Sequence, residues 1–96
     1  MPLTESQRAD LFAALESRGW SWNEGFIYAP HRSLWLLGSA PWTGDLPDFH
    51  ERMQGRLARV EWLSPEYDDP HYHRKVMDDT ASLVDVLAAL LAGKPA

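Results

Sequence analysis

The sequence contains no cysteine. This absence excludes disulfide bonds, thiolate zinc sites and cysteine nucleophiles, so any chemistry has to come from other side chains, chiefly His, Asp, Glu, Ser and Tyr. The sequence also lacks an apolar run of about 18 residues, the length that a membrane-spanning helix needs, and the first residues form no basic or apolar leader. We therefore expect a soluble, cytoplasmic protein.

Positive charge is scarce as well. The 9 Lys and Arg residues face 14 Asp and Glu residues, which gives a formal net charge of −5. Because a phosphate backbone attracts basic proteins, nucleic acid is not the expected partner. A chain of 96 residues has room for one compact domain, which we place at residues 1 to 96. So short a chain gains stability from self-association, which is a first reason to expect a homodimer.

Aromatic side chains, in contrast, are concentrated between residues 20 and 37. Turn signals divide this segment at residues 23 to 25, which contain a glycine, and at residues 29 to 32, which contain a proline. A period of two between such turns is typical of antiparallel strands. We predict a two- or three-stranded aromatic β-meander.

A helix is expected before this meander, over roughly residues 5 to 18. Thr4 and Gln7 have the spacing of a capping box, and Gly19 stands where a left-handed cap would end the helix. A second helix is expected over roughly residues 46 to 61, after Asp45 as its cap. The alternative ends that helix at Gly55 and makes residues 56 to 63 a fourth strand, but the apolar positions there alternate poorly.

The third helix is predicted over roughly residues 80 to 92. The preceding residues 64 to 74 are polar and contain two prolines, so they are expected to form a long loop. Asp78, Asp79 and Thr80 are consecutive candidates for the helix cap. The sequence therefore predicts an α+β fold in the order α-β-β-β-α-α.

The predicted loop holds the residues that most resemble an enzyme site. Asp69, His71 and His73 are ligand types for zinc, manganese or iron, and His50 from the second helix could join them. The plainer interpretation is a solvated acidic loop. No serine has a glycine-flanked elbow and no glycine motif cradles a phosphate, so acyl transfer and nucleotide hydrolysis are not expected. A metal-dependent enzyme or a metal-binding regulator remains the alternative hypothesis.

Three arginines of the second helix, Arg52, Arg56 and Arg59, have helical spacing and could bind phosphate or an acidic partner. Asp48, Glu51 and Glu61 lie between and beside them. We expect local pairs at three or four positions to neutralise much of this positive charge.

The aromatic sheet is the last candidate. If Trp20, Trp22, Phe26 and Tyr28 share the face that packs on the helices, Ile27 points the other way, and Leu34 and Leu36 likewise oppose Trp35 and Leu37. Both faces of the sheet are then apolar, and one of them needs a covering partner. The candidate interface residues are Trp22, Ile27, Leu34, Leu36 and Trp42.

The leading hypothesis from the sequence is a small non-catalytic interaction protein that needs no cofactor. It would bind itself as a homodimer or another protein through the sheet, as immunity proteins, inhibitors and small chaperones do. A third hypothesis is the binding of a sugar or another flat ligand by exposed Trp22 and Trp42.

Overall fold

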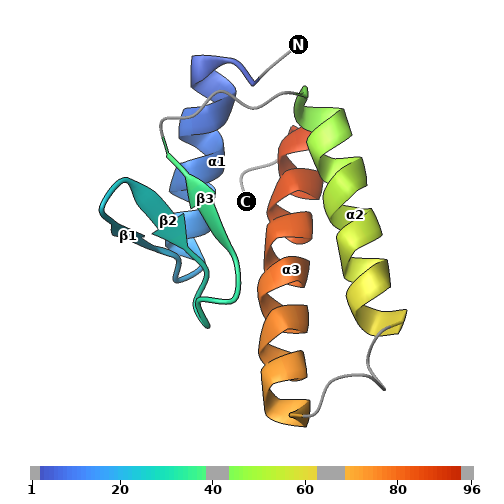
Figure 1. Ribbon diagram of the computed structural model, residues 1–96. Coiled ribbons are helices and arrows are strands. Elements are labelled where there is room, and N and C mark those ends of the chain that lie inside the picture. Colours follow the sequence, from blue (N-terminus) through green and yellow to red (C-terminus); the bar gives the residue numbers. More distant parts are fainter. Residues whose placement is uncertain (1–2, 39–43, 63–68, 94–96) are drawn as a thin grey trace.

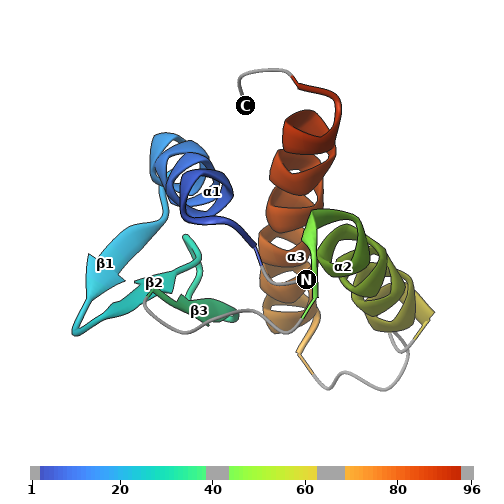
Figure 2. The ribbon, with the colours of Figure 1, turned by 90° about the horizontal axis from the view of Figure 1, so that it is seen from above.

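The computed structural model describes residues 3–38, 44–62 and 69–93. Its elements are α1 (Glu5–Ser17), β1 (Ser21–Asn23), β2 (Phe26–Tyr28), β3 (Trp35–Leu37), α2 (Leu46–Trp62) and α3 (Pro70–Leu91). One helix, three antiparallel strands and two further helices confirm the predicted α+β fold. Helix α3 lies in the middle, with α2 on one side and with α1 and the sheet on the other (Figure 1, Figure 2).

Helix α1 begins and ends as the sequence predicts. The Thr4 hydroxyl accepts from the Gln7 amide and the Gln7 side chain accepts from the Thr4 amide, both at 3.0 Å, which completes the capping box. Gly19 has a φ of 94°, and the Trp20 amide donates to the Leu15 carbonyl at 3.1 Å. This Schellman ending turns the chain directly into β1.

The strands pair in the order β1-β2-β3. A two-residue turn joins β1 to β2, with positive φ values of 52° at Glu24 and 86° at Gly25, as a type I′ hairpin requires. This turn sets Trp22 opposite Ile27 across the first ladder. In the second ladder Ile27 lies opposite Leu36.

A buried carboxylate fastens the turn between β2 and β3 to α3. The Asp79 side chain is 1% exposed. It accepts from the Ser33 hydroxyl at 2.7 Å, from the Ser33 amide at 3.2 Å and from the His31 amide at 3.3 Å. Because these backbone amides lie outside the strand ladders, Asp79 provides the hydrogen bonds that they would otherwise seek from water.

Helix α2 confirms the preferred interpretation of its sequence. Asp45 accepts from the Asp48 amide at 3.0 Å, as the predicted cap. The helix continues through Gly55 to Trp62, so the alternative of a strand over residues 56 to 62 is wrong. Residue 63, where that alternative ended, lies outside the described residues.

Helix α3 begins ten residues earlier than predicted, and the loop expected up to residue 74 is wrong from Pro70 onward. Asp69 is the N-cap and accepts from the His71 amide at 2.9 Å, while Pro70 occupies the first turn, where its missing N–H is not needed. The expected cap residues lie inside the helix. The Thr80 hydroxyl donates to the Val76 carbonyl at 2.8 Å. The loop prediction for residues 64 to 68 lies outside the described residues.

The core lies where α3 meets α1 and the inner side of the sheet. Leu83, Val86 and Leu87 of α3 are fully buried together with Leu11 and Leu15 of α1. In the described part of the chain, no helix combines the length and apolar character that crossing a membrane would require.

Candidate functional site

The two faces of the sheet contain different residues from those grouped by the sequence analysis. Asn23 pairs with Phe26, and Trp22 pairs with Ile27, because the hairpin loop has two residues. Directly paired residues point to the same side, so even positions of β1 join odd positions of β2. Trp22 and Phe26 therefore lie on opposite faces, and the shared face considered for Trp22, Phe26 and Tyr28 is wrong.

The face turned away from α1 and the core is here called the outer face, and its residues are Ser21, Asn23, Phe26, Tyr28, Trp35 and Leu37. Trp35 is 55% exposed and Leu37 is 38% exposed. The ring centroids of Phe26 and Tyr28 lie 6.2 Å apart, and those of Tyr28 and Trp35 lie 6.4 Å apart. These side chains form a continuous aromatic surface that no described helix covers.

The predicted interface residues lie mostly elsewhere. Ile27, Leu34 and Leu36 are 0%, 8% and 6% exposed and belong to the core of this chain. Trp22 is 45% exposed, but its ring packs edge-on against Phe12 of α1 at 5.1 Å and its indole N–H donates to Glu16. Trp42 lies outside the described residues. Among the predicted interface residues that the structure describes, Trp22 is therefore the one with a largely exposed side chain.

Two residues of the alternative metal site, Asp69 and His73, have side-chain contacts within the fold, and His71 contributes its backbone amide to the Asp69 cap. Asp69 caps α3, and His73 Nε2 lies 3.1 Å from the Val60 carbonyl oxygen, a geometry that fits an N–H donor. His50 belongs to α2 and has a buried Nε2 without a hydrogen-bond partner in the described structure. No group of three or more His, Asp or Glu side chains could hold a metal ion among the residues that the structure describes. The geometry gives the metal hypothesis no support.

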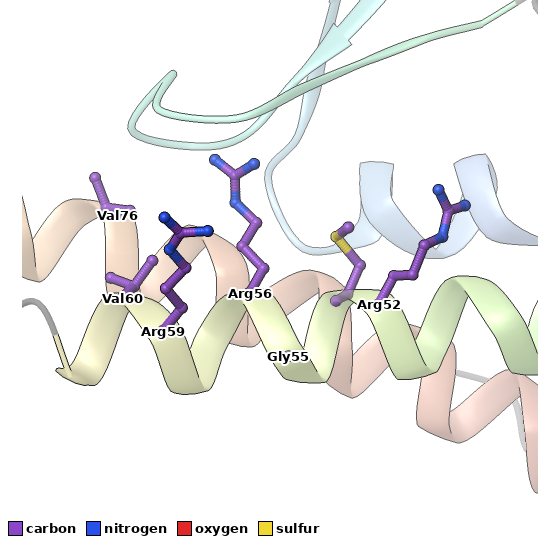
Figure 3. Close-up of a pocket in the computed structure, with 7 residues that line it drawn as sticks. Arg52, Gly55, Arg56, Arg59, Val60 and Val76 are labelled. Carbon is purple, nitrogen blue, oxygen red and sulfur yellow. The ribbon is translucent and has the colours of Figure 1, made fainter.

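A second surface feature is a cavity of about 550 Å³ between α2 and α3. We call it the arginine groove: Arg52, Arg56 and Arg59 line it, and Met53, Val60 and Val76 form its apolar part. Figure 3 shows the three arginine side chains rising from the same side of α2, with Val60 and Val76 at one end. The predicted local pairs with neighbouring acids do not form within the described residues, where none of these arginines makes an ion pair.

A smaller hollow of about 380 Å³ lies between the β2–β3 turn and α3. His31 and Ser33 line it, a combination that could in principle serve nucleophilic catalysis. The Ser33 hydroxyl, however, donates to the buried Asp79 carboxylate and so fixes the turn. Among the described residues, the His31 imidazole makes no hydrogen bond to the Ser33 hydroxyl, so the pair lacks the contact by which an imidazole activates a serine.

Sequence reasoning therefore missed the outer face, although a signal for it was present. A two-residue turn at Glu24 and Gly25 already implies that Phe26 and Tyr28 share a face with Asn23 rather than with Trp22. The function has to be argued from these surfaces, since the chain matches no protein-family profile, no curated protein and no solved structure.

Proposed function

We propose that the protein is a non-catalytic interaction domain that associates with a second copy of itself through the outer face of its sheet. The observation that carries this proposal is the exposure of Trp35, at 55%, beside Tyr28 and Leu37. Tryptophan and tyrosine supply large contact areas and dominate the energetics of protein interfaces. Leaving such rings in water forgoes the hydrophobic free energy that burial would provide.

Charge supports a second copy as the occupant. The chain carries a net charge of −5, so two copies repel each other in general. The six residues of the outer face carry no formal charge, however, and therefore can meet their own kind without opposing like charges. The face is thus suited to an isologous contact, in which the same patch serves both subunits.

The rim of the face favours one orientation. Glu24 lies in the turn at one end of β2, and Arg32 lies at the other end, with its guanidinium 5.5 Å from the centre of the Tyr28 ring. A two-fold axis that reverses the strands brings Arg32 of each copy toward the Glu24 end of the other. The opposite charges then guide the register of the dimer.

Sedimentation velocity across a concentration series tests the proposal. The wild-type protein should shift from monomer to dimer as concentration rises, and Trp35→Glu should remain monomeric. Because Trp35 is exposed, this change leaves the fold intact. Loss of a central aromatic contact is expected to weaken association by a factor of about 30 or more.

Trp62→Glu is the matched control, because Trp62 is 76% exposed but lies at the end of α2. This variant should dimerise like the wild type, with circular dichroism confirming that both variants are folded. A wild-type protein that stays monomeric up to about 1 mM would overturn the proposal. If both variants weakened the dimer equally, the dimer contact would not lie on the outer face.

A further inference from the structure

The arginine groove has an arrangement that the protein's own contacts do not explain. Arg56 and Arg59 are exposed and make no ion pair or hydrogen bond with the described residues. Arg52 lies above the Phe49 ring at 5.7 Å, and it borders a neighbouring hollow that Asp48 and Glu51 also line. The positive charge of the groove is therefore least compensated at Arg56 and Arg59.

The groove combines this charge with apolar surface. Val60 of α2 and Val76 of α3 line one end of the groove and are 7% and 6% exposed, and the half-buried Met53 adds apolar surface farther along it (Figure 3). From Arg52 to Arg59 the helix advances about 10 Å, at about 1.5 Å per residue. A single phosphate or carboxylate cannot span that length. The groove therefore suits a ligand with several anionic groups and at least one apolar group.

Gly55 is a second and independent observation. It lies at the centre of α2 and lines the groove, yet a Cβ atom at this position would meet no atom within 4 Å. Its backbone does not have the positive φ that would demand glycine. Glycine weakens the middle of a helix, so no feature of the described chain accounts for it. Its bare surface allows another backbone to approach α2 closely.

We propose that the arginine groove binds an acidic peptide segment of another protein, with an apolar side chain of that segment seated on Val60 and Val76. Carboxylates of the segment would accept forked hydrogen bonds from Arg56 and Arg59. A peptide supplies spaced carboxylates, apolar side chains and a backbone that can pass over Gly55. A nucleic acid fits less well than a short acidic segment, because its many phosphates extend beyond the arginines and meet a chain whose net charge is −5.

Fluorescence anisotropy with a labelled peptide of Glu and Leu residues tests this assignment at low salt. A matched peptide with Gln in place of Glu, inorganic phosphate and a single-stranded oligothymidylate complete the comparison. The acidic peptide should bind, more weakly as salt screens the charges, and the Gln peptide should bind at least about tenfold more weakly. Competition by phosphate or the oligonucleotide at equal or lower concentration would overturn the peptide as occupant, as would absence of peptide binding up to about 1 mM.

Variants locate the site. Arg56→Gln/Arg59→Gln should weaken peptide binding about tenfold or more, since each charged hydrogen bond contributes substantially. Arg18→Gln/Arg74→Gln is the control with the same change in net charge, because those arginines pair with Asp85 and Asp78 away from the groove. Equal loss in both double variants would show a diffuse charge effect and overturn the groove.

Gly55→Leu is the second probe, because it fills the groove without removing charge and leucine is a good helix former. It should weaken peptide binding while the helical signal persists. The double variant Arg56→Gln/Arg59→Gln should still dimerise, and Trp35→Glu should still bind the peptide. The experiments therefore distinguish a failure of the peptide-binding proposal from a failure of the dimer proposal.

Discussion

Asp79 is the single residue that most directly connects the sheet to the helices. Its carboxylate is 1% exposed and accepts three hydrogen bonds from His31 and Ser33. A buried acceptor with these partners holds the β2–β3 turn, and that turn sets where β3 and its Trp35 begin. The position of Trp35 on the outer face therefore depends on a carboxylate of α3.

Asp79→Ala should lower the free energy of unfolding by about 2 to 4 kcal/mol, because a buried carboxylate is removed and two amides and a hydroxyl in part-buried hydrogen bonds lose their acceptor. Asp79→Asn keeps one carbonyl oxygen and should lose less. The adjacent Asp78 is the control: its side chain is 55% exposed and forms only a long ion pair, 3.9 Å from Arg74, so Asp78→Ala should change stability by less than about 0.5 kcal/mol. Urea titration followed by circular dichroism measures all three, and similar losses at both positions would contradict the role of Asp79.

The sequence alone could not have identified this role. Asp79 was a plausible helix cap, because aspartate commonly starts helices and an apolar helix face follows it. Its actual partners lie 46 and 48 positions away in the chain. The outer face was more accessible to sequence reasoning, since the two-residue turn at Glu24 and Gly25 fixes the pairing of β1 with β2.

Two glycines show how the same residue type has different roles in different elements. Neither Gly25 nor Gly55 has an atom within 4 Å of a Cβ built on its backbone. Gly25 has a φ of 86° in the hairpin turn, whereas Gly55 lies inside α2. An added methyl group would therefore meet no neighbouring atom at either position. The two substitutions should differ in effect only because the backbone conformations differ.

Gly25→Ala should destabilise the protein by about 1 to 2 kcal/mol, because an L side chain is strained at positive φ. Gly55→Ala should stabilise it by about 0.5 to 1 kcal/mol, because alanine is the better helix former and loses less freedom on folding. Thermal unfolding of both variants checks the opposite signs. A loss of stability in Gly55→Ala would mean that the glycine has a structural role within the chain and would weaken its link to a ligand.

At the level of elements, local signals predicted the ends of α1 and the start of α2 because their caps are formed by residues close in sequence. Thr4 with Gln7, and Asp45 with Asp48, interact over three positions. The start of α3 was missed although Asp69 and Pro70 form an equally local signal. The segment from His71 to Arg74, which follows them, is polar and largely exposed, so it lacks the apolar periodicity by which a helix is recognised in a sequence.

At the level of the molecule, α3 is shared by both halves of the structure. It packs against α1 and contributes Leu83, Val86 and Leu87 to the core, while Val76 lies near Val60 of α2 (Figure 3). The two proposed binding surfaces lie on either side of this helix. The outer face belongs to the sheet, and the arginine groove is formed by α2 together with Val76 of α3. Trp35 and the arginines are the exposed parts of these two surfaces, whereas Val60 and Val76 of the groove are buried.

If α3 joins these halves into one folding unit, a cavity in it should destabilise the sheet and the helices together. Leu83→Ala should lower the free energy of unfolding by about 2 to 5 kcal/mol, because Leu83 is 0% exposed. Leu91→Ala is the control on the same helix, since Leu91 is 40% exposed and its truncation should change stability little.

Two spectroscopic probes follow the two halves separately. Trp20 is buried beside the sheet, and its indole N–H lies 3.4 Å from the Ser82 hydroxyl of α3. Tryptophan fluorescence should therefore respond to loss of the packing between sheet and helices, while far-ultraviolet circular dichroism reports the helices. Coincident transitions in urea, shifted equally by Leu83→Ala, are the expected result. Two separated transitions would mean that the hairpin and the helical pair unfold independently, and that a partner bound to one surface would not stabilise the other.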